Sequence, residues 1–185
     1  MRLINLSGGS DQLHVWVVNS LGGVYVFNSS TGHFEGLGVP GCATNISAGN
    51  GENPWITGCQ TGGEHEVYRW LGGDFGWALA GSNFLAHQVT GAWSDAITVA
   101  LHIDGPYKWD HASASWVSLG SPGSLRWVDF TLSGIGIGTD GKIYNFYDGH
   151  GWLEPQSYTG PFGCQWIQVT PGYALDSCGH LYQDL

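Results

Sequence analysis

A three-residue pattern recurs along this chain at a spacing of about forty residues. Each copy has a carboxylate or amide residue, an apolar residue and then Ser or Thr, which is the alternation typical of a β-strand. The copies are Asn5-Leu6-Ser7, Asn45-Ile46-Ser47, Gln88-Val89-Thr90, Asp129-Phe130-Thr131 and Gln168-Val169-Thr170. A second pattern, a tyrosine after Val, Ile, Leu or Pro, runs in phase with the first at Tyr25, Tyr68, Tyr107, Tyr144 and Tyr182. Two patterns in phase at one period indicate five copies of one structural unit.

Each unit predicts four strands in a fixed order. The inner strand carries the first pattern, and the second strand is expected at 14–19, 54–57, 96–101, 134–138 and 173–175. A turn containing Gly leads to the third strand with its Tyr. The fourth strand holds an aromatic residue, at Phe34, Trp77, Trp116 and Trp152. No segment has sustained 3.6-residue periodicity, so we expect almost no helix. The sequence therefore predicts an all-β, five-bladed β-propeller.

We expect residues 1–185 to form one domain with blades at about 1–39, 40–82, 83–123, 124–162 and 163–185. The fifth unit has no fourth aromatic strand, which predicts a last blade of three strands. Its exposed edge is expected to be blunted or to pair with another molecule, so a homo-oligomer through that edge is one expected outcome.

The charge of the chain excludes several classes of partner. Its formal net charge is −10, with only 5 Lys and Arg residues. Nucleic acids and anionic membranes are bound by clustered Lys and Arg, so neither is expected as a partner. No apolar run approaches the roughly 20 residues that span a bilayer. The start of the chain lacks the basic region and apolar core of a signal peptide, which indicates a mature form with an added Met or export by another route.

The four cysteines are expected to form two disulfides. In an antiparallel pair the start of one strand lies beside the end of the next, which brings Cys42 near Cys59 and Cys164 near Cys178. A zinc site and four free thiols are the alternatives, and the absence of Cys-x-x-Cys disfavours zinc. Two disulfides indicate an oxidising compartment, so we expect a secreted protein. Of three Asn-x-Ser sequences, only that at Asn28 is expected in a loop suited to glycosylation.

Four elements of the chain resemble the tectonin repeat, which reads roughly Ile-Ser-x-Gly, Trp-x-Val-Asn, Gly-x-Ile-Tyr and Trp-x-x-Leu. They are Asn45-Ile46-Ser47-Ala48-Gly49, Trp16-Val17-Val18-Asn19, Gly23-Val24-Tyr25-Val26-Phe27 and Trp116-Val117-Ser118-Leu119. Tectonin-like and tachylectin-like propellers are often carbohydrate-binding lectins. The resemblance therefore implies a sugar-binding propeller.

The sequence offers little support for catalysis or for a cofactor. The Gly-rich stretch 134–142 has Ile143 after its Lys, whereas a phosphate-binding loop requires Ser or Thr there and a following helix. No Gly-x-Ser-x-Gly or His-Glu-x-x-His occurs, and the His residues lack the spacing of metal ligands. Most carboxylates are predicted in turns, where they usually bond their own backbone. We therefore expect no enzyme, no cofactor and no metal.

Three tryptophans have no place in the repeated packing pattern, namely Trp93, Trp127 and Trp166. An exposed indole suits a sugar, whose apolar face stacks on it while its hydroxyls meet polar groups. The polar candidates recur near the ends of the second strands, at Asn19, His102, Asp140 and Asp176. The alternative interpretation is that these tryptophans are core or rim aromatics.

The predicted function is therefore a multivalent lectin with shallow sugar sites formed by loops between blades, and glycans or glycoconjugates as partners. The alternatives are a secreted protein-interaction module or effector and, less favoured, a glycoside hydrolase acting at the central channel.

Overall fold

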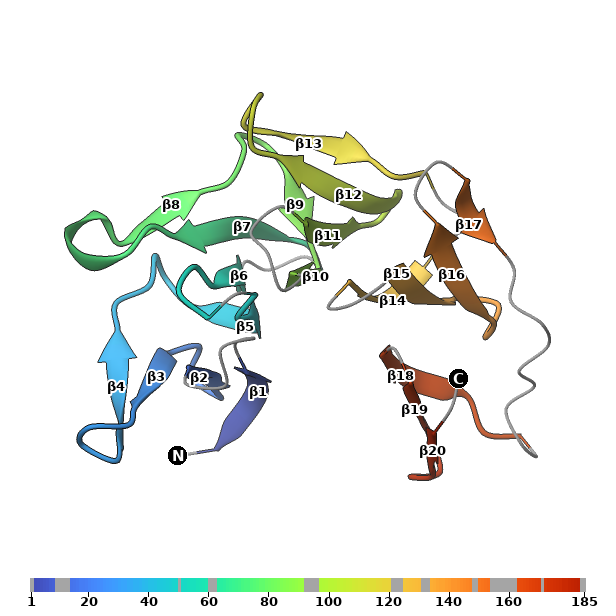
Figure 1. Cartoon of the computed structure of the whole chain (residues 1–185), viewed down its shortest axis with the longest axis horizontal. Helices are drawn as coiled ribbons and strands as arrows, with labels where there is room; N and C mark the ends of the chain where they lie inside the picture. Colours follow the sequence, from blue (N-terminus) through green and yellow to red (C-terminus); the bar gives the residue numbers. More distant parts are fainter. Residues whose placement is uncertain are drawn as a thin grey trace.

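The computed structural model describes residues 2–8, 14–49, 51–59, 63–91, 97–120, 125–130, 134–147, 150–153, 163–170 and 172–183. They form antiparallel sheets arranged as a five-bladed β-propeller (Figure 1). Within these ranges the one helical element is a single 3-10 turn, Gly73–Phe75. The predicted fold class and the low helix content are confirmed.

In every blade the strands are hydrogen-bonded in the order in which they follow along the chain. Blade 1 contains β1 (Leu3–Gly8), β2 (Val15–Asn19), β3 (Val24–Asn28) and β4 (His33–Leu37). Blade 2 contains β5 (Ala43–Ser47), β6 (Trp55–Gly58), β7 (His65–Trp70), β8 (Trp77–Leu79) and a short β9 (Leu85–Ala86), which also pairs with β7. Blade 3 contains β10 (Gln88–Gly91), β11 (Thr98–His102), β12 (Gly105–Asp110) and β13 (Ser115–Ser118).

Blade 4 contains β14 (Leu125–Asp129), β15 (Gly134–Gly138), β16 (Ile143–Tyr147) and β17 (Gly151–Leu153). Blade 5 contains β18 (Trp166–Thr170), β19 (Tyr173–Asp176) and β20 (Leu181–Gln183). The predicted three-stranded last blade is confirmed. Figure 1 shows the blades as an arc, with β1 at one end and β18 to β20 at the other.

Each blade has two apolar faces, because side chains of a strand point alternately to opposite sides of the sheet. We call the side that meets the next blade the forward face and the side that meets the preceding blade the rear face. Between blades 1 and 2, the forward residues Trp16 and Val18 pack with the rear residues Ile46 and Ile56. Similar clusters fill the other three seams between consecutive blades, so the core consists of four layers arranged around the arc.

The inner-strand pattern of blade 4 differs from its prediction. Its strand register places Val128 opposite Gly136, as Ile46 lies opposite Ile56 in blade 2. The structural equivalent of Asn45-Ile46-Ser47 is therefore Trp127-Val128-Asp129, and the predicted Asp129-Phe130-Thr131 is wrong by two residues. Strand alternation repeats every two residues, so a shift of two leaves the polar and apolar pattern unchanged.

Both predicted disulfides are confirmed. Cys42 pairs with Cys59 at a Cα–Cα distance of 5.4 Å, and Cys164 pairs with Cys178 at 5.8 Å. Each bridge joins the start of the inner strand of a blade to the end of its second strand, and this pairing indicates folding in an oxidising compartment. No helix within the described ranges is long and apolar enough to cross a membrane.

Candidate functional site

The inner strands of the five blades surround a central cavity of about 350 Å³. β1, β5, β10, β14 and β18 all contribute to its wall. Its polar lining consists of amide, hydroxyl and carboxylate residues, namely Asn5, Ser7, Asn45, Ser47, Gln88, Thr90, Asp129 and Gln168. These are the residues of the repeated inner-strand pattern, with Trp127 in the place of an amide in blade 4. The most regular feature of the sequence therefore builds this cavity.

The polar residues of this pattern also join consecutive blades. In the first three seams, side-chain oxygens of one inner strand accept hydrogen bonds from backbone N–H groups of the next. The bonds run from Ile46 N to Asn5 Oδ1 (3.0 Å), Ala48 N to Ser7 Oγ (2.9 Å), Val89 N to Asn45 Oδ1 (2.9 Å), Gly91 N to Ser47 Oγ (2.8 Å), Val128 N to Gln88 Oε1 (3.2 Å) and Phe130 N to Thr90 Oγ1 (3.2 Å). We call this set the interblade ladder. The ladder explains why the pattern repeats, and it gives Asn5 and Asn45 a role in the fold.

Trp127 joins blade 4 to blade 5 through its indole. Its Nε1–H donates to the carbonyl of Val169 at 3.0 Å, as the Gln88 amide donates to the carbonyl of Val128 at 2.8 Å. Trp127 is half-buried and lines the central cavity, and its side chain also packs against the core between blades 4 and 5. The indole therefore lies on the inner strand β14, at the centre of the propeller, and not in a loop between blades.

Several polar groups of the cavity have no protein partner in the described part of the chain. The Oδ1 atoms of Asn5 and Asn45 accept ladder bonds, and no bond is formed by their Nδ2 groups with described residues. Gln168 also has no partner there and is exposed. The cavity can therefore offer amide donors and acceptors to a small polar ligand.

Asp129 is the one carboxylate among the described residues that line the cavity. Glycoside hydrolysis generally requires two carboxyl groups on either side of the scissile bond. The described lining therefore holds one of the two carboxyl groups that such a reaction uses.

The structure places the three candidate tryptophans in different surroundings. Trp166 is only 3% exposed and packs edge-to-face on Tyr182 with ring centroids 5.0 Å apart. The prediction that Trp166 stacks on a sugar is therefore wrong, because its ring belongs to the core between blades 4 and 5. Trp127 lines the cavity, and Trp93 lies outside the described residues.

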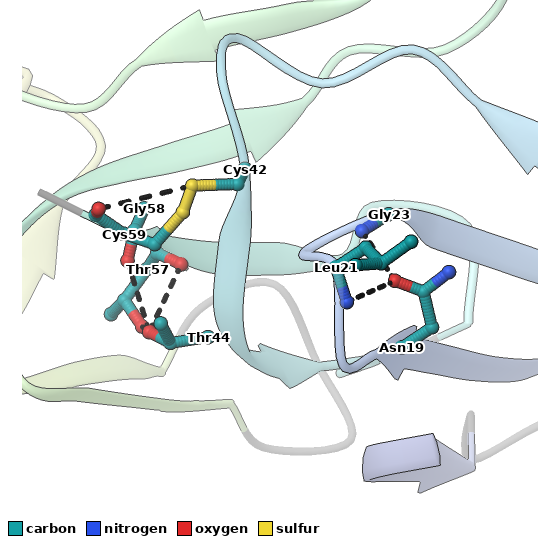
Figure 2. The surroundings of a disulfide bond; sticks show 8 residues. All are labelled: Asn19, Leu21, Gly23, Cys42, Thr44, Thr57, Gly58 and Cys59. Atoms are coloured by element: carbon teal, nitrogen blue, oxygen red, sulfur yellow. Dashed lines mark hydrogen bonds between the residues drawn. A yellow bond between two sulfur atoms is a disulfide. The ribbon is translucent and has the colours of Figure 1, made fainter. Parts of the chain in front are cut away.

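Asn19, one of the predicted sugar ligands, holds a turn of blade 1. Its Oδ1 accepts from Leu21 N and Gly23 N, each at 2.9 Å, and its Nδ2 donates to the Tyr25 hydroxyl at 3.2 Å. Figure 2 shows the two backbone bonds beside the Cys42–Cys59 bridge. Because Asn19 is buried and its amide is used in the hairpin, the predicted contact with sugar is wrong.

Asp176 likewise holds the corresponding turn of blade 5. Its Oδ1 accepts from Cys178 N and His180 N, and its Oδ2 bonds the His180 ring and the Tyr182 hydroxyl. Burial opposes ionisation, but these bonds outweigh it and lower the pKa of Asp176 to about 2. Asp176 is 1% exposed and fully engaged, so its predicted role in sugar binding is also wrong.

Asp140 and His102 occupy the same turn in blades 4 and 3. The Tyr144 hydroxyl donates to Asp140 at 2.7 Å, and this bond, with that from Lys142 N, lowers the pKa of Asp140. His102 Nδ1 accepts from Asp104 N at 3.1 Å. These polar residues recur because the hairpin turn recurs, and in blades 1, 4 and 5 a hydrogen bond also ties this residue to the Tyr of the third strand.

A candidate metal-binding group lies at the β19–β20 turn of blade 5. Ligand atoms of Cys164, Asp176 and His180 lie within 4.8 Å of one another. The sulfur of Cys164 is bonded to Cys178, however, and the Asp176 oxygens already accept from the turn. The group has no free thiolate and no free carboxylate to offer a cation while the disulfide is intact.

Comparisons with known proteins establish the fold and no family. No family model and no curated protein matches the chain. Similar solved structures include YCF48 bound to D1 peptide (TM-score 0.66, 17% identity, covering 99% of this chain and 64% of that one). Another is TolB from Acinetobacter baumannii (TM-score 0.64, 15% identity, covering 94% of this chain and 50% of that one). A third is U3-55K (TM-score 0.64, 10% identity, covering 96% of this chain and 61% of that one). The chain thus spans between half and 64% of the length of these proteins.

Proposed function

We propose that this protein is a non-catalytic carbohydrate-binding protein whose binding site is the central cavity. The observation that carries the proposal is the half-buried indole of Trp127 beside a ring of amide and hydroxyl side chains. A sugar ring has an apolar face that stacks on an indole and hydroxyls that bond amides. The cavity, at about 350 Å³, lies at the lower end of the range of about 300–1,000 Å³ for small-molecule sites.

This site differs from the several sites expected from the sequence. The turn residues Asn19, Asp140 and Asp176 are engaged in their hairpins, whereas the cavity is a single site at the centre. One sugar ring in one site offers few contacts, so each molecule should bind weakly. Strong binding to a glycan surface would then need several linked molecules.

A protein-interaction module is the second candidate function. One similar structure is described as bound to a peptide, and blade 1 and blade 5 both carry exposed apolar side chains. A hydrolase has less support because the described lining of the cavity holds a single carboxylate.

Glycan-array binding of the oxidised protein tests the proposal. Gln168→Ala removes from the cavity wall an exposed amide that has no partner among the described residues, so it should weaken binding about fivefold, as expected for one hydrogen bond. Gln183→Ala removes an exposed amide from β20, which is not part of the cavity lining, and is the matched control. Trp127→Ala should abolish binding per folded molecule.

The outcomes separate the candidates. Equal binding by wild type and Gln168→Ala, with loss of binding in Trp93→Ala, would place the sugar at Trp93 and contradict the cavity site. Absence of glycan binding by the wild type, together with capture of one specific protein, would favour the interaction module.

A further inference from the structure

The forward face of blade 5 has the apolar character of the other forward faces but is left uncovered. Leu181 is 69% exposed, whereas its register equivalents Val24, Val67 and Ile143 are at most 2% exposed. Tyr173 is 44% exposed, although the equivalent Trp16, Trp55, Val99 and Ile135 are all buried. Blade 5 thus keeps the kind of residues that the other blades bury against a neighbour.

The rear face of blade 1 shows the matching feature. Leu6 lies opposite Val17 in the sheet and is 64% exposed, whereas the equivalent Ile46, Val89, Val128 and Val169 are at most 3% exposed. Leaving a large aliphatic side chain in water forgoes the stabilisation that its burial would bring. The two ends of the arc therefore carry one unmatched forward face and one unmatched rear face.

Polar residues on the blade 5 face match the interblade ladder. Gln168 and Thr170 occupy the positions of Gln88 and Thr90, which accept bonds from backbone N–H groups of blade 4. Neither has a hydrogen-bond partner in the part of the chain that is described. Both line a pocket of about 140 Å³ together with Tyr173, Ala174, Leu175 and Leu181. At the other seams, the aliphatic residue of the next blade's inner strand packs against the forward-face residues that correspond to the lining of this pocket.

The repeat thus defines the surface that fits the forward face of blade 5. That surface is the rear face of another blade, with an aliphatic residue on its inner strand. Blade 1 of the same molecule lies at the other end of the arc (Figure 1). The four seams between are each fixed by a packed cluster, and close-packed interfaces resist the rotation that would bring the ends together.

We propose that blade 5 of one molecule binds blade 1 of a second copy of this chain, head to tail. Leu6 of the second copy fills the pocket of about 140 Å³. Gln168 Oε1 accepts from Leu6 N and Thr170 Oγ1 from Gly8 N, as Gln88 and Thr90 accept from Val128 N and Phe130 N. The contact is made by the faces of the blades and not by the free edge of β20, which was the expectation from the sequence.

Charge sets how this association depends on salt. The described residues of the blade 5 face, which are Gln168, Thr170, Tyr173, Leu175, Leu181 and Gln183, carry no formal charge. Each molecule has a net charge of −10, so two copies repel one another at long range. Added salt screens this repulsion, and the association should strengthen as ionic strength rises. An association held by oppositely charged groups would instead weaken as ionic strength rises.

Sedimentation of two face variants tests the proposal. Leu6→Asp blocks the rear face of blade 1, and Leu181→Asp blocks the forward face of blade 5, because each places a charge in an apolar contact. Leu21→Asp adds the same charge in the β2–β3 turn, at a side chain that is 87% exposed, and is the control. Circular dichroism and thermal unfolding show whether each variant is folded.

We expect wild type and Leu21→Asp to assemble with rising concentration, and each face variant alone to remain a monomer. An equimolar mixture of the two face variants should give a dimer and nothing larger, because it holds one competent pair of faces. A monomeric wild type at high protein and salt concentration would overturn the proposal, as would a mixture that does not associate. Energetic coupling between Leu6→Ala and Leu181→Ala in a monomer would also overturn it, since the faces would then meet within one molecule.

Discussion

Thr90 and Thr170 occupy the same position of the repeat but face different surroundings. The Oγ1 of Thr90 accepts from Phe130 N at 3.2 Å in a buried seam, whereas Thr170 has no partner in the described part of the chain. Replacing each by Val keeps the shape and removes the hydroxyl. The two substitutions therefore differ in whether a backbone N–H is left unpaired.

The expected cost follows from that difference. In Thr90→Val the buried N–H of Phe130 loses its acceptor, which costs about 1–3 kcal/mol of unfolding free energy. For a chain of this length each kcal/mol corresponds to about 2–4 °C in Tm. Thr170→Val leaves no N–H unpaired in the monomer, so its unfolding free energy should change by less than about 0.5 kcal/mol.

Urea unfolding at low protein concentration measures both effects. The midpoint should fall for Thr90→Val at an unchanged m-value, which reports lost stability with the same surface exposed. The midpoint for Thr170→Val should match wild type. Equal losses in the two variants would refute the conclusion that these hydroxyls act by joining one blade to the next.

Three further predictions concern the turns and bridges. The pKa of Asp176 in the folded state is about 2, below its usual 3.8. The ionised carboxylate therefore stabilises the fold above about pH 4, and this stabilisation is lost as the pH falls toward 2. The Tm of Asp176→Asn should accordingly fall less steeply over this pH range than the Tm of wild type. Gly22→Ala should destabilise the fold strongly because the new Cβ would lie 2.3 Å from the Cys42 Cβ. Gly32 has a similar positive φ but no atom within 4 Å of such a Cβ, so Gly32→Ala should lower the unfolding free energy by only about 1 kcal/mol, measured by thermal unfolding. Replacing Cys42 and Cys59 together by Ser should lower the unfolding free energy by about 2–4 kcal/mol, and a reducing agent should then have a smaller effect on the variant.

The repeat made most of the fold predictable from sequence. Five copies of a polar-apolar-hydroxyl strand in phase with a recurring Tyr determine blade number and strand order, because independent local signals agree. The disulfides follow from the same reasoning, since the repeat brings Cys42 beside Cys59. The register of β14 was missed, because Trp127 takes the place of an amide through its indole N–H and alternation alone cannot detect a shift by two residues.

The candidate site was less predictable because recurrence has two physical causes. Asn19, Asp140 and Asp176 recur in the same hairpin turn, as ligands of a multisite binder would, yet their oxygens bond backbone N–H groups of that turn. Sequence shows which positions are polar and not which atoms they meet. Trp166 shows the same limit, since the sequence offers it as an exposed indole while the structure buries its ring.

Sugar binding in the central cavity is tested most directly by NMR, following the chemical shifts of the indole N–H groups of the oxidised protein during titration with monosaccharides. The signal of Trp127 is identified by its loss in Trp127→Phe, and its chemical shift should change with sugar concentration and reach a plateau. The signals of Trp55 and Trp166, which are buried between blades, should stay in place. Saturable movement of the Trp93 signal alone, or no movement of the Trp127 signal with any sugar, would contradict binding in the cavity.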